Sequence, residues 1–124
     1  MLTSAERDGC HSHGLYRLPA FLDGCTGGVL NPSAEPEVID VLPGVVKVDG
    51  HGGFQQVAQE AGFKLLVEKA KSQGVAMMGV VNTHGMSGAM WYPAEQLALQ
   101  GVAAIICSNT VGYVSRGVGS SRYV

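Results

Sequence analysis

Two histidines, a serine and an arginine lie close together in the segment CHSHGLYRLPAF, residues 10–21. Histidine readily donates or accepts a proton near neutral pH, and arginine can hold a carboxylate through two parallel hydrogen bonds. In a helix beginning here, the i, i+4 spacing would place His13 and Arg17 on one face. Such a pair suits an α-keto, α-hydroxy or α-imino acid, with Arg17 on the carboxylate and His13 exchanging a proton beside it.

The same residues also permit a purely structural interpretation. Ser12 would cap a helix, His13 would be solvated in its first turn, and Arg17 would extend along the surface. A metal site is a further alternative, because His11 and His13 would point the same way on a strand. Two imidazoles without a third ligand nearby do not make a metal centre, so we expect no metal.

Composition limits the classes of function. With 124 residues, 46% of them hydrophobic, the chain has the length of one domain and can bury a core. Eight basic and ten acidic residues give a net charge of −2 without a basic cluster, which argues against nucleic-acid and membrane partners. The sequence has no apolar run of about 20 residues and no signal-peptide core near its start. We therefore expect a cytoplasmic protein with a small-molecule partner.

The apolar pattern predicts an α/β fold in which strands alternate with helices. The expected helices are residues 15–22, 54–72 and 87–101, and the expected strands are residues 38–41, 45–50, 75–82 and 102–109. In the longest helix, Val57, Ala61, Leu65 and Ala70 form the expected apolar face. Pro93 is compatible with a helix only in its first turn, and Gly101 provides the stop.

Two glycine-rich segments follow strands. VDGHGGF (48–54) matches neither G-x-G-x-x-G nor the P-loop pattern, which excludes both phosphate-binding motifs, and we expect a tight strand-to-helix turn. NTHGMSG (82–88) is a polar loop with His84, which would contact a cofactor or serve only as a connection.

Taken together, these motifs resemble the malate/L-lactate dehydrogenase family, whose NAD(P)-binding fold is not the Rossmann fold. The resemblance covers essentially the whole chain, and its most specific part is H-S-H-G-x-x-R. The residues of this segment are most similar to those of the branch of Δ1-piperideine-2-carboxylate and Δ1-pyrroline-2-carboxylate reductases. The supporting segments are D-G-x-H-S-H-G-L-Y-R-L-P (8–19), N-P (31–32), V-D-G-x-x-G-F (48–54), E-K-A-K-S-Q-G-V (68–75), T-H-G-M (83–86) and S-N (108–109).

The resemblance implies NAD(P)H-dependent reduction of a cyclic imino acid to the L-amino acid, or of a related 2-oxo acid. It implies that Ser12 and His13 are catalytic, with His13 as proton donor, and that Arg17 binds the substrate carboxylate. Thr83 and His84 would contact the cofactor, either NADPH or NADH. Family enzymes are homodimers with sites near the subunit interface.

The chain departs from the family pattern in two respects. Members usually read S-[NH]-H-[FIY] where this chain has T-H-G-M, so His84 fits only one of the usual histidine places. Members are also several hundred residues long, and the aspartate of the Ser-His-Asp relay lies beyond the position of Val124. We expect residues 1–124 to be a single partial domain, truncated at both ends, in which a substrate-binding segment leads into the start of the NAD(P)-binding domain. The alternative is an inactive fragment or non-catalytic association module without a completed cofactor site.

Overall fold

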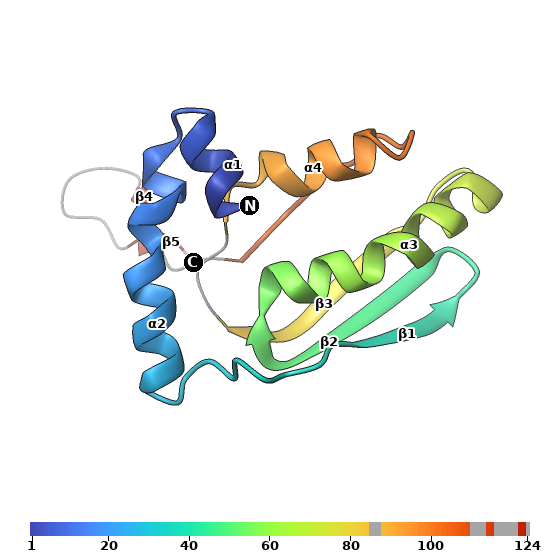
Figure 1. Cartoon of the computed structure of the whole chain (residues 1–124). Helices are drawn as coiled ribbons and strands as arrows, with labels where there is room; N and C mark the ends of the chain where they lie inside the picture. Colours follow the sequence, from blue (N-terminus) through green and yellow to red (C-terminus); the bar gives the residue numbers. More distant parts are fainter. Residues whose placement is uncertain (85–87, 110–113, 116–121, 124) are drawn as a thin grey trace.

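The computed structural model describes residues 1–84, 88–109, 114–115 and 122–123, and its α/β architecture agrees with the expected class (Figure 1). Helix α3 lies along a small sheet, and α1 and α2 stand at one end of it. No described helix combines the length and apolar character needed to cross a bilayer. The α-helices are α1 (Leu2–Arg7), α2 (Leu18–Thr26), α3 (Gln55–Gln73) and α4 (Trp91–Ala98), and the strands are β1 (Glu37–Leu42), β2 (Val45–Phe54), β3 (Met77–His84), β4 (Val114–Ser115) and β5 (Arg122–Tyr123).

The main sheet has the order β1-β2-β3. Strands β1 and β2 form an antiparallel hairpin that pairs Val38 with Val48, and the break at Pro43-Gly44 agrees with the sequence prediction. Strand β3 runs parallel to β2, with Val80 opposite Val48, so the chain must cross over the sheet between them. Helix α3 makes this crossover, which explains why a long helix separates the two strands.

Helix α3 packs on the sheet through a different face from the one predicted. Val57 and Ala61 are exposed, whereas Ala58 and Gly62 are buried and Leu65 is half-buried. A Cβ at position 62 would lie 2.7 Å from Cγ2 of Val48, so the missing side chain permits the close approach of helix and strand. The prediction counted apolar side chains and therefore gave no weight to a glycine as a packing position.

The glycine-rich segment after Val48 is a strand, not the tight turn expected from the sequence. Strand β2 continues to Phe54, and its pairing with β3 shifts register between Asp49 and Gly53. His51 and Gly52 adopt φ values of 48° and 76°. This local backbone conformation forms a bulge that shifts the register without ending the strand. Glycine is needed here for the local backbone of a bulge.

Residues 102–109 do not form the expected strand. An apolar run indicates that a segment can be buried, but a strand also needs a pairing partner, and Ile105 is 97% exposed. Strand β3 was predicted two residues too early, whereas α4 begins later than expected and holds Pro93 in its first turn, as the sequence required. Gly101, at φ 82°, follows the helix as its predicted stop.

Lys69 holds the β1–β2 hairpin against α3. It is 8% exposed, and its Nζ donates hydrogen bonds to Oδ1 of Asp40 and to the carbonyl oxygen of Leu42, each at 2.8 Å, and to that of Pro43 at 3.3 Å. The charged group therefore caps the end of β1 and its turn, while its aliphatic stem lies in the helix–sheet interface.

We expect Lys69→Met to lower the free energy of unfolding of the chain by about 1 to 3 kcal/mol, because methionine keeps the apolar stem but removes the charge-assisted hydrogen bonds. Urea denaturation measures the change. Lys64→Met, at an exposed position of the same helix, is the control and should have little effect. Equal losses in the two variants would show that the hairpin contacts contribute nothing.

Candidate active site

The segment with the two histidines forms two short 3-10 turns, His11–His13 and Leu15–Arg17, separated by the buried Gly14. The backbone N–H of Arg17 donates to the carbonyl oxygen of Gly14 at 3.0 Å, and α2 begins immediately afterwards. The expectation of one helix over this region is therefore wrong for its first half. The start of α2 at Leu18 places Pro19 in its first turn, where a missing N–H costs nothing.

The structure nevertheless brings Ser12, His13 and Arg17 together. Oγ of Ser12 lies 3.0 Å from Nδ1 of His13, and Nε of Arg17 donates to the carbonyl oxygen of Ser12 at 2.7 Å. The thiol of Cys10 lies 3.8 Å from the same Nδ1. His13 and Arg17 are half-buried and Ser12 is exposed. A hydroxyl, an imidazole and a guanidinium therefore form one connected polar group at the surface.

Glu6 is a member of this neighbourhood that the sequence interpretation missed. Its Oε1 lies 2.6 Å from Nδ1 of His11, and its Oε2 accepts a hydrogen bond from the backbone N–H of Leu15 at 3.0 Å. The Leu15 N–H first, and the His11 ring second, hold the pKa of Glu6 below its ordinary value. The sequence did not indicate these contacts, because no helical periodicity relates Glu6 to residues beyond the end of α1.

The contact with Glu6 also bears on the metal alternative. Nδ1 of His11 pairs with the carboxylate of Glu6, whereas Nδ1 of His13 pairs with the hydroxyl of Ser12. Over the described ranges, no three histidine, cysteine or acidic side chains are grouped so as to hold a metal ion.

Thr83 and His84 lie at the carboxyl end of β3, opposite Gly53 and Phe54 of β2. His84 is exposed and Thr83 half-buried, while Gly85 and Met86 of the same motif fall outside the described residues. The ring of Phe54 packs edge-to-face on Phe21 of α2, with centroids 5.7 Å apart. This aromatic contact links the strand ends to the helix that follows Arg17.

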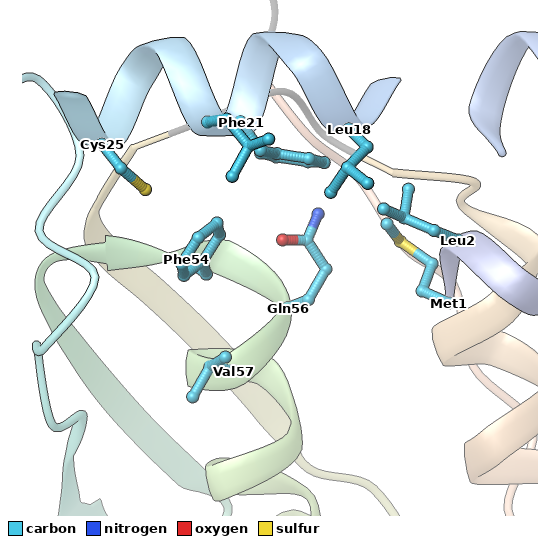
Figure 2. A pocket seen from close by; sticks show the side chains of 9 residues that line it. Met1, Leu2, Leu18, Phe21, Cys25, Phe54, Gln56 and Val57 are labelled. Atoms are coloured by element: carbon cyan, nitrogen blue, oxygen red, sulfur yellow. The ribbon is translucent and has the colours of Figure 1, made fainter. Parts of the chain in front are cut away.

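An apolar pocket of about 280 Å³ lies between α2 and the start of α3 (Figure 2). Figure 2 shows Phe21 and Leu18 above it, with Phe54 and Gln56 opposite. None of the predicted site residues lines this pocket; its lining is Met1, Leu2, Leu18, Phe21, Leu22, Cys25, Phe54, Gln56 and Val57.

Asp49 anchors the irregular stretch of β2 to β3. Its carboxylate accepts hydrogen bonds from the backbone N–H of His51 at 3.0 Å and from Nδ2 of Asn82 at 2.7 Å. The first of these, followed by the second, lowers the pKa of Asp49. His51 and Asn82 both have positive φ, so the carboxylate ties together two unusual backbone positions.

The lowered pKa of Asp49 predicts a loss of stability in acid. The stabilisation is complete above the ordinary aspartate pKa of about 3.9 and is lost as the pH falls through the lower pKa of the folded state. We expect the urea midpoint of the chain to fall between about pH 5 and about pH 2, and to fall less in Asp49→Asn. Asp23→Asn, on α2, is the control. The same decrease in Asp49→Asn as in the parent would contradict the assignment.

Comparisons with known proteins give a consistent result. The family model described as malate/L-lactate dehydrogenase matches residues 1–124. A Δ1-pyrroline-2-carboxylate/Δ1-piperideine-2-carboxylate reductase of Pseudomonas putida is 41% identical over 108 residues, covering 87% of this chain and 31% of that protein. The reductase of the same name from Pseudomonas aeruginosa is 39% identical over 118 residues, or 95% of this chain and 35% of that protein.

A solved structure agrees with these sequence matches. The crystal structure of Δ1-piperideine-2-carboxylate reductase from Pseudomonas syringae pvar. tomato superposes with a TM-score of 0.77 and 41% identity. The match covers 81% of this chain and 30% of that one. The expected partial, non-Rossmann α/β fold is thereby confirmed, and the chain spans about a third of the length of these relatives.

Proposed function

Because the chain belongs to the malate/L-lactate dehydrogenase family, we propose that it supplies the substrate-binding and proton-transfer residues of an NAD(P)H-dependent reductase. The substrate is a cyclic imino acid, Δ1-piperideine-2-carboxylate or Δ1-pyrroline-2-carboxylate, or a related 2-oxo acid, and the imino acids yield the L-amino acid. The observation that carries the proposal is the connected group of Ser12, His13 and Arg17. The names of the curated relatives give the substrate class.

His13 is the proton donor in this proposal. Its Nδ1 is held by the hydroxyl of Ser12, so Nε2 is the ring atom through which it delivers a proton to the substrate nitrogen or oxygen. Ser12 is the second catalytic residue of the proposal: its hydroxyl contacts Nδ1 and thereby orients the imidazole for proton transfer. Reduction of a C=N or C=O bond adds a hydride at carbon and a proton at the nitrogen or oxygen. His13 provides this proton.

Arg17 binds the substrate carboxylate in this proposal. A guanidinium has five N–H donors in a planar fork, and the bond to the Ser12 carbonyl oxygen uses one nitrogen of that fork. This bond also fixes Arg17 relative to the backbone that carries the proton donor. A carboxylate held by Arg17 would therefore place the adjacent C=N or C=O group near His13.

A nicotinamide cofactor, NADPH or NADH, supplies the hydride when it is bound. Thr83 and His84 fit such a group because a hydroxyl and an exposed imidazole stand at the carboxyl end of a parallel strand pair, where α/β proteins commonly bind cofactors. We assign cofactor contact to these two residues.

We further propose that the complete enzyme is a cytoplasmic homodimer. Leu15, Leu18 and Leu22 expose 51%, 44% and 57% of their surface along one continuous segment, which supports an association face. Sedimentation equilibrium of the complete enzyme tests the assembly, and a monomer at all concentrations would contradict it.

The activity is tested in a complete enzyme in which residues 1–124 replace the corresponding segment of the Pseudomonas putida reductase; we call it the carrier enzyme. We expect it to oxidise NADPH or NADH with at least one of the two imino acids, pyruvate or oxaloacetate. A folded carrier enzyme that binds NADPH but reduces none of them would contradict the proposal. The isolated chain is assayed for NADPH binding by fluorescence, and we expect weak binding or none.

A further inference from the structure

The carboxylate of Glu6 joins the two ends of the segment that carries Ser12 and His13. Oε1 contacts Nδ1 of His11 at 2.6 Å, in the first 3-10 turn, and Oε2 accepts the Leu15 N–H at 3.0 Å, in the second. The residues between these two contacts are Ser12, His13 and Gly14. A single side chain from α1 therefore spans the short segment from which the proton donor projects.

Gly14 makes room for this carboxylate. A Cβ at position 14 would collide with Oε2 of Glu6 and would approach its Cα to 3.2 Å. Gly14 is also buried, although the residues on either side of it are more exposed. The carboxylate thus occupies the volume that a side chain would fill, and the backbone of the segment rests on it.

Backbone hydrogen bonds give the segment further support, including one from the N–H of Cys10 to the carbonyl oxygen of Ala5 in α1 at 2.8 Å. The backbone N–H of His13 donates to the carbonyl oxygen of Cys10 at 2.9 Å, and the N–H of Gly14 to that of His11 at 3.1 Å. The bonds of His13 and Gly14 lie within the first turn and do not fix its position relative to the second turn. Two side chains join the turns: Glu6 through His11 and Leu15, and Arg17 through the carbonyl oxygen of Ser12. Arg17 has additional support because it directly precedes α2.

We propose that Glu6 is a positioning residue for the Ser12–His13 pair, acting through its reach from His11 to Leu15. This role rests on the proposed function, because it assumes that His13 transfers the proton. Displacement of a reacting group by about 1 Å can reduce the rate a hundredfold, so loosening this segment should affect turnover. Binding of the substrate carboxylate should be affected less, because Arg17 is held by the start of α2.

Two variants of the carrier enzyme separate reach from charge. Glu6→Gln keeps the length of the side chain: its oxygen can accept the Leu15 N–H and its amide can donate to His11. Glu6→Asp keeps the charge but is one methylene shorter and cannot span both contacts. We expect Glu6→Asp to lower kcat about tenfold or more, with KM and NADPH affinity nearly unchanged, and Glu6→Gln to retain most of the parent kcat. Arg7→Ala, which removes an exposed ion pair with Asp8 from the same helix, is the control and should keep the parent kcat.

The outcomes distinguish this role from the function on which it rests. An unchanged kcat in Glu6→Asp, or an equal loss in both Glu6 variants, overturns the positioning role while leaving the reductase activity intact. A parallel loss of NADPH affinity in Glu6→Asp also overturns it, since that result marks a general structural effect. A folded parent carrier enzyme without imino acid or 2-oxo acid reduction overturns both the proposed function and the role of Glu6.

Discussion

His13→Asn is expected to lower the kcat of the carrier enzyme about a hundredfold or more, because asparagine fills a similar space but cannot deliver a proton. The imidazole is held through Nδ1 by Ser12, and the asparagine amide that replaces it has no proton to give near neutral pH. KM for the imino acid should change much less, since the proposed function assigns carboxylate binding to Arg17. Steady-state rates at saturating NADPH provide kcat and KM separately.

The control for this substitution is His51→Asn. His51 is an exposed histidine in the irregular part of β2, and asparagine tolerates its positive φ. We expect this variant to retain the parent kcat. If His13→Asn also kept the parent kcat, or if both variants lost the same activity, His13 would not be the proton donor.

Arg17→Ala is expected to raise KM for Δ1-piperideine-2-carboxylate by about tenfold to a hundredfold, because a charge-assisted hydrogen-bonded contact with the carboxylate is lost. A smaller decrease in kcat should accompany it, since the bond from Nε to the Ser12 carbonyl oxygen disappears as well. Arg17→Lys keeps the charge without the planar fork and should give an intermediate KM.

Arg7→Ala is the control for the loss of an arginine, because Arg7 pairs with Asp8 on the surface of α1. Its KM should equal that of the parent. An unchanged KM in Arg17→Ala would remove the carboxylate role and would leave the bond to Ser12 as the only function assigned to this side chain.

The fold was predictable where local pattern determines local structure. The hairpin of β1 and β2 and the helix that follows agree with the sequence because valine-rich runs, Pro43-Gly44 and a terminal glycine act locally. The buried face of α3 was not predictable in the same way, since Gly62 is buried through its lack of a side chain. Pairing is also non-local, which is why the apolar run at residues 102–109 was wrongly predicted as a strand.

The candidate site was predictable in its residue types more than in its geometry. Ser12, His13 and Arg17 were identified by chemistry and by the family motif, and the structure brings them into contact. The connection differs from the predicted helical face, because Gly14 divides the segment into two turns. Glu6 was missed because its partners lie across the end of α1, where no periodicity relates side chains.

The most direct test of the account compares two substrates in two enzymes. Initial rates are measured for Δ1-piperideine-2-carboxylate and for Δ1-piperideine, which lacks the carboxylate, in the carrier enzyme and in its Arg17→Ala variant. If this segment binds the carboxylate beside the proton donor, the parent will strongly prefer the carboxylated imine, and the variant will lose most of that preference. Equal rates for the two imines in the parent, or an undiminished preference in Arg17→Ala, would contradict carboxylate binding by this segment.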